Sequence, residues 1–471
     1  MARKKNRLQR LADSERELIA GEMNWKGQFV SKMEEGRALI KGAYPGYPCL
    51  VKFGKAKKRE IRATVVDYMD KPDTATKPRC KDFESCGGCS LQHMSYDSQC
   101  EIKKHLFSVE HSALLEGIGS LKLHPAPVEY GYRNKMEFTF IEHKGGEKML
   151  GLHEQGRFQS VLPLETCWIQ HKSMDSVFRF VRDWYSHTDI PGYNPWSHRG
   201  ILRHLVLRGS AKDSKVLVNL VLREKCRDLD SLYDRLLQMP EVAGVYETIH
   251  SGVADAVIYD SLNHVGGDLS LQEKVGHCTF EVGPRSFYQT NSEGMFVLYC
   301  AIEKIIQDYC LKDLREKNLK LLDLYCGAGS IGIFLSRNFS EVIGIEEVQE
   351  AVKLASSNAK LNGVSNLTVV NAQVENSEHL LGDLGGVDVL VVDPPRSGCH
   401  PRARKWIRNL GVPWLIYVSC NPKTLKENLA DFIGERDNES SNQYELVNVE
   451  LVDLFPHTPH LESISLLRLK N

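Results

Sequence analysis

Short apolar runs separated by amphipathic stretches organise the C-terminal part of the chain. The run at residues 319–324 ends in a turn of small residues with Gly327, Gly329 and Gly332, and a helical pattern follows. Similar runs recur, with helical stretches between most of them, at residues 342–345, 367–370, 387–392 and 414–418. This alternation predicts a parallel sheet covered by helices. The last two runs, 445–452 and 463–469, have no helix between them and predict an antiparallel hairpin at one edge.

The beginning and the middle of the chain show mainly strand patterns. Residues 21–70 alternate short apolar runs with glycine turns, which is typical of a small β-barrel. Residues 132–283 show alternating strands with one exposed face, and helices are expected at 174–185 and 229–237. A chain of 471 residues exceeds one hydrophobic core. We therefore expect a multidomain α/β protein: a basic tail at 1–20, a barrel at 21–72, a central α+β domain at 73–283 and a C-terminal domain at 284–471.

Composition and charge narrow the classes of protein that fit. Hydrophobic residues make up 42% of the chain and charged residues 26%, with a formal net charge of −1. These values describe a soluble globular protein, so a basic surface for a nucleic acid would have to be local. No apolar run is long enough to span a membrane, and the basic N-terminus lacks the apolar stretch of a secretory signal. The 13 cysteines, an odd number without an export signal, favour free thiols and a cytoplasmic location.

One basic cluster falls on a predicted hairpin of the N-terminal barrel. Its members share a short stretch of sequence and are Lys52, Lys55, Lys57, Lys58, Arg59 and Arg62. Such a cluster is either a solvated loop or a surface that contacts phosphates. Pro72 and Pro78, with polar residues between them, indicate a linker after the barrel.

Three cysteines, Cys80, Cys86 and Cys89, surround a pair of glycines. Glycines let the backbone fold tightly, so the thiolates can converge on one metal. A tetrahedral site needs a fourth ligand; we choose Cys167, with Cys100 as the alternative. The spacing does not separate zinc from an iron–sulfur cluster, since thiolates bind both. Buried thiols without a metal are the other interpretation.

Two functional side chains are expected on one edge of the C-terminal sheet. The strand at 387–392 ends in the sequence DPPRSG, which begins at Asp393, and the strand at 414–418 ends in SCNP around Cys420. Cys420 follows its strand instead of lying inside an apolar run, and a nucleophile is placed in this way. Cys326 and Cys399 lie in neighbouring loops and are rivals by position. Glu462 follows a proline-bounded loop and is a candidate general base or, more simply, a surface charge.

The glycine turn and the next strand end predict a nucleotide-type pocket. Gly327 and Gly329 allow a ligand to approach the backbone, at the carboxyl end of a strand, where open α/β sheets bind ligands. Glu346 ends the strand at 342–345. Its carboxylate can accept hydrogen bonds from ribose hydroxyls, or it can stabilise the N-terminus of the next helix. The glycine spacing alone is equally compatible with a simple packing turn.

Together these motifs resemble the RNA 5-methyluridine methyltransferase family, whose members transfer a methyl group from S-adenosylmethionine to carbon 5 of a uridine in ribosomal or transfer RNA. The resemblance rests on DPPRSG from Asp393, on LIYVSCNPKT around Cys420 and on DLFPHTPHLE, which ends at Glu462. It implies a Rossmann-like class I methyltransferase sheet in the C-terminal domain. The N-terminal barrel resembles the OB-type TRAM module that binds RNA. The cysteines resemble the four ligands of a [4Fe–4S] cluster in the branch that acts on 23S ribosomal RNA.

The resemblance also implies a role for each matching residue. Cys420 would add to carbon 6 of the uracil, which makes carbon 5 nucleophilic towards the methyl group, and Glu462 would remove the carbon 5 proton. Phe287 would pack on the target base, which must leave its stack. The implied cluster ligands are Cys80, Cys86, Cys89 and Cys167. The implied cofactor residues are Gln289, Tyr325, Ser330, Glu346, Gln373 and Asp393. Ser330 stands where relatives often have Asn, and Gln373 lies in a loosely matching segment.

Several alternatives stay open at this point. Ribosomal RNA is the expected substrate, and transfer RNA is the alternative within the same reaction. A non-catalytic RNA-binding protein is the alternative from another class; it would predict a lost nucleophile, whereas Cys420 is present. Enzymes that methylate amino groups usually have an aromatic residue after Asp-Pro-Pro, where this chain has Arg396. We expect a monomer that does not associate with membranes.

Overall fold

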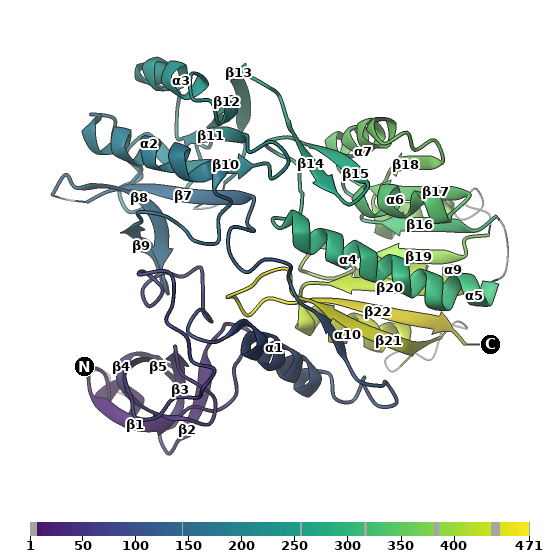
Figure 1. The fold of residues 1–471 in the computed structure, drawn as a ribbon, viewed down its shortest axis with the longest axis horizontal. Helices are drawn as coiled ribbons and strands as arrows, with labels where there is room; N and C mark the ends of the chain where they lie inside the picture. The colour runs from purple at the N-terminus through teal and green to yellow at the C-terminus, as the bar shows by residue number, and fades with distance from the viewer. Residues whose placement is uncertain are drawn as a thin grey trace. The chain divides into compact units, whose positions relative to one another are not determined.

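The computed structural model describes residues 7–143, 145–254, 257–314, 318–380, 386–434 and 443–470 (Figure 1). The chain divides into two compact units, and the second is the larger. The first unit comprises Met1–Glu110, Leu152–Leu164 and Phe455–His460. The second comprises His111–Gly151, Glu165–Leu454 and Leu461–Asn471. The four segments expected from the sequence stay a prediction, because the contacts between residues divide the chain into only these two units.

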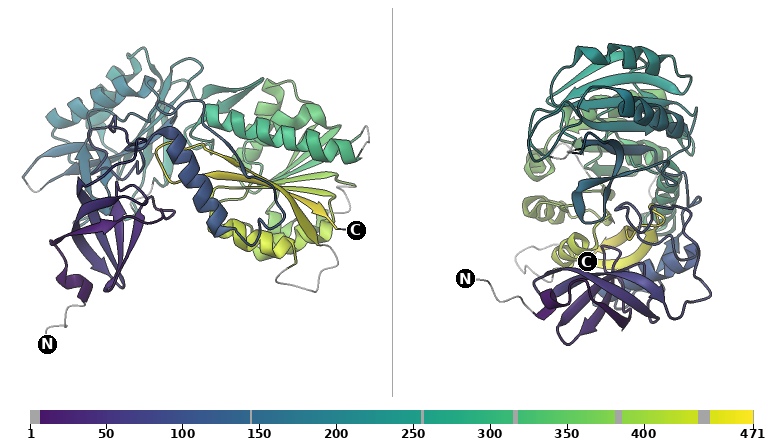
Figure 2. Two further views of the ribbon diagram at one scale, coloured as in Figure 1. Left: turned by 60° about the horizontal axis from the view of Figure 1, so that its bottom comes forward. Right: turned by 90° about the vertical axis from the view of Figure 1, so that its left-hand side faces the viewer.

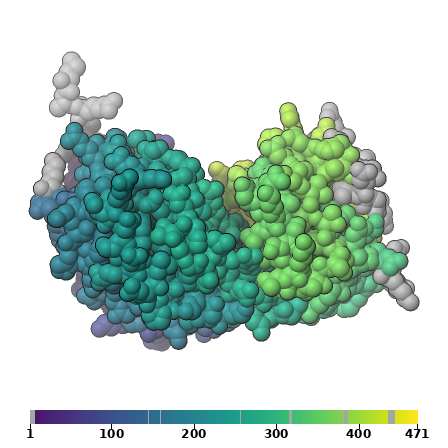
Figure 3. Space-filling view, turned by 90° about the horizontal axis from the view of Figure 1, so that it is seen from above, coloured from purple at the N-terminus to yellow at the C-terminus, as the bar shows by residue number. Residues whose placement is uncertain are grey.

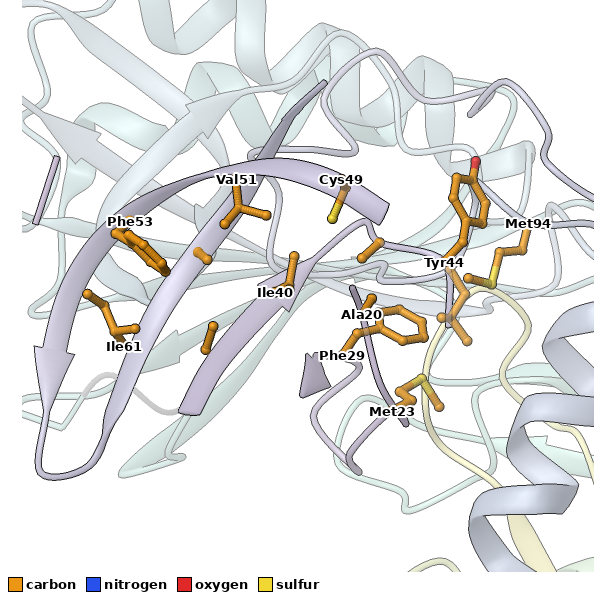
Figure 4. Packing of buried hydrophobic residues seen from close by; sticks show 14 of the residues in the cluster. Ala20, Met23, Phe29, Ile40, Tyr44, Cys49, Val51, Phe53, Ile61 and Met94 are labelled. Atoms are coloured by element: carbon orange, nitrogen blue, oxygen red, sulfur yellow. The ribbon is translucent and has the colours of Figure 1, made fainter. Parts of the chain in front are cut away.

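A five-stranded sheet in the order β1-β4-β5-β3-β2 forms most of the first unit. Alternate residues of β4 are buried, among them Cys49, Val51 and Phe53, and they pack with Phe29 and Ile40 in one apolar core (Figure 4). β1 lies inside the segment assigned to the tail, so the sheet begins earlier than the sequence indicated. The elements are η1 (Arg7–Arg10), β1 (Glu15–Ile19), β2 (Phe29–Met33), β3 (Gly36–Lys41), β4 (Pro48–Lys57), β5 (Glu60–Tyr68), α1 (Tyr96–Glu110) and β9 (Arg157–Pro163).

The second unit begins with a sheet whose strands run in the order β13-β12-β11-β10-β7-β8. Every residue of β10 and β11 is buried. Helices α2 and α3 contact this sheet through β10 and β12 and occupy the two stretches where helices were expected. The bounds are β7 (Lys135–Glu142), β8 (Lys148–Glu154), α2 (Ser173–His187), β10 (Leu202–Gly209), β11 (Val216–Leu222), η2 (Arg227–Leu229), α3 (Asp230–Leu237), β12 (Val242–Ile249) and β13 (Ser261–Gly267).

A hairpin and a long helix lead from this sheet to the next one. The hairpin pairs β14 (Leu271–Val275) with β15 (Cys278–Val282). Helix α4 (Ser292–Ile305) starts at Asn291, whose side chain accepts a hydrogen bond from the Gly294 backbone N–H, as expected for an N-cap. The π-helical turn η3 (Ile306–Cys310) and the short helix α5 (Leu311–Leu314) follow it.

The C-terminal sheet has eight strands in the order β18-β17-β16-β19-β20-β22-β21-β6. The first five are parallel, and β22 runs antiparallel to both its neighbours, so the expected parallel sheet and antiparallel hairpin are confirmed. The expected edge position of the hairpin is wrong, because β6 pairs with the outer side of β21. Helices cover both faces (Figure 2). The elements are β6 (Lys122–His124), β16 (Lys320–Leu324), α6 (Ser330–Leu335), η4 (Ser336–Asn338), β17 (Glu341–Glu346), α7 (Gln349–Leu361), β18 (Leu367–Asn371), η5 (Val374–Leu380), β19 (Val389–Val392), α9 (Pro401–Leu410), β20 (Trp414–Ser419), α10 (Pro422–Phe432), β21 (Tyr444–Val452) and β22 (Glu462–Leu469).

The parallel strands of this sheet bring their carboxyl ends, and the loops that follow them, to one edge. In the space-filling view, the surface of the second unit is hollowed between the teal residues of its first sheet and the green residues of the C-terminal sheet (Figure 3). Among the described helices, none combines the length and the apolar character that crossing a bilayer requires.

Candidate active site

Strand register brings Cys420 and Glu462 together. β20 pairs antiparallel with β22, and Ser419 lies opposite Ser463 at the end of the ladder. Cys420 follows Ser419 on one strand and Glu462 precedes Ser463 on the other, so these two residues lie side by side at the end of the β20–β22 ladder. The Ser463 hydroxyl donates a hydrogen bond of 3.1 Å to the Ser419 carbonyl oxygen, which fixes this register. Glu462 is only 3% exposed, whereas Cys420 is partly exposed.

Burial and neighbouring charges set the protonation of this pair. Burial raises the pKa of the Cys420 thiol to about 11, and the Glu462 carboxylate adds to the increase. Burial also holds the pKa of Glu462 well above its usual range, reinforced by the charge of Asp393. The positive charge of the Arg396 guanidinium opposes both shifts, because it lowers the pKa of Cys420 and of Glu462. Arg396 therefore favours the charged forms of Cys420 and Glu462.

Hydrogen bonds hold the Arg396 turn against the Cys420 loop. The Asn421 side-chain amide donates to the Arg396 carbonyl oxygen at 2.8 Å, and its Oδ1 accepts from the Lys423 backbone N–H at the start of α10. The turn itself closes through a bond of 2.8 Å from the Gly398 N–H to the Pro395 carbonyl oxygen. Gly398 has φ of 74°, a value that favours glycine. Arg396 and Asn421 had been noted only as parts of motifs, and their spacing gives no sign of this contact.

The glycine loop after β16 is open on its outer side. Gly327 has φ of 55°, and a Cβ placed on it would meet no atom within 4 Å. Its N–H donates to Glu346 Oε2 at 3.0 Å, and Glu346 Oε1 accepts from the Val348 N–H at 2.8 Å. The Glu346 carboxylate therefore links the glycine loop to the start of α7. This agrees with the interpretation that Glu346 stabilises the N-terminus of that helix. A ligand that lies over Gly327 would meet backbone and carboxylate oxygen without a side chain between.

A buried carboxyl that the sequence did not identify supports the same loop. Asp323, on β16, is 1% exposed, and its Oδ2 accepts a hydrogen bond of 2.9 Å from the Gly332 N–H in α6. Burial raises the pKa of this carboxyl to about 8. A Cβ on Gly332 would lie 3.1 Å from the same oxygen, so the glycine permits the close approach. The available signal was one carboxylate inside the apolar run at residues 319–324.

Four of the expected cofactor residues follow three adjacent strands of the C-terminal sheet. Tyr325 and Ser330 follow β16, Glu346 ends β17, and Asp393 follows β19. Burial raises the pKa of Tyr325, whose hydroxyl also interacts with the Cys399 thiol, and burial raises the pKa of Asp393 to about 6. Carboxylates at neighbouring strand ends favour a cationic ligand such as a sulfonium ion.

Ser330 and Gln373 have partners within the protein. The Ser330 Oγ lies 2.7 Å from the hydroxyl of Tyr299, a buried residue of α4. Gln373 is exposed and pairs with Asn376 at 2.6 Å and with Glu347 at 3.4 Å. The side chains of Ser330 and Gln373 are therefore engaged by neighbours within the protein, as is the carboxylate of Glu346.

The segment before α4 is held by Asn134, which directly precedes β7. The Asn134 side chain donates to the Gln289 carbonyl oxygen at 3.1 Å and to the Ser292 hydroxyl at 3.0 Å, and its backbone N–H donates to the Thr290 carbonyl oxygen. Phe287 in this segment is 78% exposed, an unusual state for an aromatic side chain. Asn134 thus holds the segment that contains Phe287. The sequence around Asn134 is polar and gave no sign of this contact.

The cysteine cluster expected from the sequence lies mainly in the first unit. Cys86 and Cys89 are buried, and the Gly88 N–H donates to the Cys86 sulfur at 3.3 Å. Cys167 belongs to the second unit, and all 13 cysteines are free thiols. Within the described ranges, no group of three or more His, Cys, Asp or Glu side chains has an arrangement suited to a metal ion. The four-cysteine site thus stays a prediction from the resemblance.

Comparisons with known proteins agree with this geometry. The model of the tRNA (uracil-5-)-methyltransferase family matches residues 266–470. An uncharacterised RNA methyltransferase of Caldanaerobacter subterraneus is 34% identical over 452 residues, which cover 95% of this chain and 97% of that protein. Another from Clostridium tetani is 32% identical over 472 residues and covers 97% and 98%.

A solved structure shares the fold. The tRNA (uracil-54, C5)-methyltransferase of Pyrococcus abyssi, in complex with S-adenosyl-L-homocysteine, aligns with a TM-score of 0.74 over 96% of this chain and 100% of that one, at 23% identity. Together with the sequence relatives, this likeness accounts for the sheet and the strand-end loops described above. The chain belongs to the S-adenosylmethionine-dependent RNA (uracil-5-)-methyltransferase family.

Proposed function

We propose that this protein methylates carbon 5 of a uridine in structured RNA, with Cys420 as nucleophile and Glu462 as general base. The observation that carries the proposal is the register of β20 and β22, which sets these two residues side by side with Arg396 against the thiol. A uracil needs both groups, because carbon 5 becomes nucleophilic only after addition at carbon 6 and must later lose a proton.

Each step can be assigned to a group of this chain. The Cys420 thiolate forms a bond to carbon 6, and the electron pair of the C5–C6 double bond moves to carbon 5 and the adjacent carbonyl. S-adenosylmethionine, when bound, supplies the methyl group that carbon 5 takes up. Glu462 then accepts the carbon 5 proton, the C5–C6 double bond re-forms, and the sulfur leaves carbon 6 as a thiolate.

Protonation in the free protein defines what substrate binding must achieve. The pKa of Cys420, raised to about 11, leaves the sulfur protonated at neutral pH. Burial likewise raises the pKa of Glu462 and so favours its protonated form. We propose that the bound base and the Arg396 guanidinium together shift both groups to their charged forms, so that the reactive thiolate appears only when RNA is present.

The cofactor would be held by residues at the carboxyl edge of the C-terminal sheet. Support comes from the open space over Gly327 and from the carboxylates of Glu346 and Asp393 at neighbouring strand ends. We propose that Tyr325, Ser330, Gln289 and Gln373 complete this site. Phe287, exposed before α4, is the proposed stacking partner of the extruded base.

We further propose ribosomal RNA, most specifically 23S, as the substrate, and a [4Fe–4S] cluster held by Cys80, Cys86, Cys89 and Cys167. Both proposals rest on the resemblance of the cysteine motif. The same proposal includes an N-terminal sheet that forms an OB-like, TRAM-like module. It also includes a monomeric protein located in the cytoplasm, where thiols stay reduced. Iron and acid-labile sulfide analysis of protein purified without oxygen tests the cluster; less than one iron per chain would contradict it.

Transfer RNA is a second candidate because of one specific observation. The solved relative with the same fold is a methyltransferase for uracil 54 of tRNA. The matching family model carries a tRNA description as well. Both observations concern relatives, so the choice between the two RNA classes depends on the experiment below.

The deciding experiment is a nucleoside analysis by mass spectrometry. The protein is incubated with methyl-labelled S-adenosylmethionine and with separate pools of ribosomal and transfer RNA from cells that lack it. Cys420→Ala is assayed in parallel, with Cys226→Ala as the matched control, since Cys226 is a partly exposed thiol outside the strand-end loops. We expect labelled 5-methyluridine from the wild type and from the control. Cys420→Ala should lower the rate of its formation by roughly 10⁴-fold or more. Activity retained by Cys420→Ala would refute the nucleophile.

A further inference from the structure

The first unit contains a cavity of about 400 Å³ that belongs to none of the sites above. It is lined by the ends of β3 and β5, by the start of the segment after β3, by His93 and by residues from the segment 71–84. The sequence indicated that part of this segment, from Pro72 to Pro78, is a linker. This segment packs back on the unit: the Thr76 N–H donates to the His93 carbonyl oxygen, and the Ser95 N–H donates to the Thr74 carbonyl oxygen. A volume of this size is typical of sites for small ligands.

Aromatic rings form the wall of the cavity. The rings of Tyr68, Tyr44, His93 and Phe83 form a continuous chain, with centroids 5.2, 5.0 and 5.5 Å apart in that order. Tyr44 lies at the end of the apolar core beside Met94 (Figure 4). Tyr68 is partly exposed, and its hydroxyl is used in a bond of 2.6 Å to the Gly42 carbonyl oxygen. Tyr44, His93 and Phe83 are only 3–4% exposed, so Tyr68 is the ring of these four that a planar ligand can reach.

Lysines surround the same cavity. Lys71 and Lys77 are exposed, and the Lys71 ammonium lies 4.3 Å from the centroid of the Tyr68 ring. Lys41 lies deeper, with its ammonium bonded to the carbonyl oxygens of Phe83, Glu84 and Cys86. Glu84 is the one acidic residue among the lining groups, against three lysines. The lining thus carries a net positive charge beside the aromatic wall.

A basic track on the sheet leads to the cavity. Alternate residues of a strand share a face, so Arg62, Thr64 and Val66 of β5 lie on the same exposed face. Lys52 of β4 pairs with Thr64 and stands on that face as well. Thr64 and Val66 line the cavity. The two basic side chains, one on β4 and one on β5, therefore lie on the exposed face next to the residues that line the cavity.

We propose that this cavity binds one unstacked base of the RNA substrate, with Lys71 and Lys77 on its phosphates and Tyr68 on its face. Aromatic stacking combined with lysines along a strand is how single-stranded nucleic acid is bound without base-specific contacts. The inference rests on the proposed function, because it requires an RNA substrate. It assigns that substrate a second single-stranded contact, apart from the target uridine.

The test measures RNA binding and methylation separately on the full-length protein. The probe is a fluorescein-labelled single-stranded RNA of ten nucleotides, titrated at several salt concentrations. We expect Tyr68→Leu to raise Kd about tenfold, the effect of losing one stacked base. Lys71→Ala with Lys77→Ala should lower the slope of log Kd against log salt by about 1.4, or 0.7 for each phosphate of a single strand. Lys32→Ala, an exposed lysine on β2, is the control and should leave both values unchanged.

A direct readout excludes a mere loss of folding. Photo-crosslinking of the wild type with 4-thiouridine in the same RNA should mark peptides that contain Tyr68 or Phe83. Crosslinks confined to other segments, or an unchanged Kd for Tyr68→Leu, would overturn the proposal even if 5-methyluridine is still formed. If the wild type forms no 5-methyluridine yet binds the probe with these crosslinks, the proposed reaction fails and the base-binding cavity stands. Absence of RNA binding by the wild type would overturn the cavity as well.

Discussion

Two buried ionisable side chains, Lys41 in the first unit and Glu462 in the second, have contrasting hydrogen-bond surroundings. In the first unit the Lys41 ammonium is 7% exposed and bonds to three backbone carbonyl oxygens, at 2.8 to 3.0 Å. In the second unit Glu462 is 3% exposed, and its carboxyl makes no hydrogen bond to another described residue. A buried charge with all its hydrogen bonds satisfied stabilises a fold, whereas one without them shifts its pKa and stays available for proton transfer.

The largest expected effect concerns Glu462, the group without partners. Glu462→Gln keeps the shape of the side chain and removes the base, so the reaction should halt after methyl transfer, with RNA still bonded to Cys420. We expect turnover to fall by about 10³-fold, within the range for loss of a general base, and a protein–RNA adduct to appear on denaturing gels. Glu450→Gln, a change to a carboxylate paired with His124 elsewhere in the second unit, is the control. Full turnover by Glu462→Gln would exclude the base role.

The second effect concerns Lys41, the group with three partners. Lys41→Met should destabilise the first unit by about 2–3 kcal/mol, since three buried carbonyl oxygens lose their donor. Chemical denaturation, followed by limited proteolysis of the first unit, measures the change, and Lys32→Met serves as control because Lys32 is exposed. Unchanged stability would mean that the hydrogen bonds of Lys41 only offset the cost of burying its charge. Lys41 would then not stabilise the first unit, and its contrast with Glu462 would be lost.

The smallest expected effect concerns the pH dependence of stability. Most carboxylates in folded proteins have a lowered pKa and lose stability as pH falls, whereas Glu462 should cause a loss of stability as pH rises. Glu462 has a pKa above its unfolded value, so the folded state holds its proton where the unfolded state has lost it. Stability is then greatest below the unfolded pKa and falls as pH rises towards the folded one.

Glu462→Gln, which mimics the protonated form, should therefore have the same Tm as the wild type near pH 4 and a higher Tm at pH 8. The difference should be a few degrees, given roughly 2–4 °C per kcal/mol for a unit of this size. Differential scanning calorimetry at the two pH values measures it. A lower Tm for the variant at pH 8 would show that Glu462 is stabilised by its surroundings.

The sequence predicted most of the sheet topology because apolar runs and helical stretches alternate strictly after residue 319. It also identified Cys420, since a polar loop directly after an apolar strand places a cysteine at the sheet edge. Arg396 was missed as a partner of the thiol because its contact depends on the side chain of Asn421, in a different loop. Asp323 was missed because a carboxylate inside an apolar run becomes meaningful only when the Gly332 N–H is known to face it.

The cavity of the first unit shows a different limit of sequence reasoning. Its wall includes Ala75, Thr76 and Lys77, between two prolines that indicated a linker. Polar composition describes exposure and does not describe where a segment packs, so the boundary expected at residue 72 passes through the lining of one cavity. The rings that meet there come from positions 44, 68, 83 and 93, and no local pattern connects them.

The outer strand of the C-terminal sheet has a consequence for producing the enzyme in pieces. β6 pairs with β21 through Lys122, Leu123 and His124, far earlier in the chain than the rest of that sheet. A fragment that begins at residue 266, where the family match begins, would leave one side of β21 with unpaired backbone groups. Exposed strand edges recruit other chains, so such a fragment is expected to self-associate unless the short segment is supplied as a peptide.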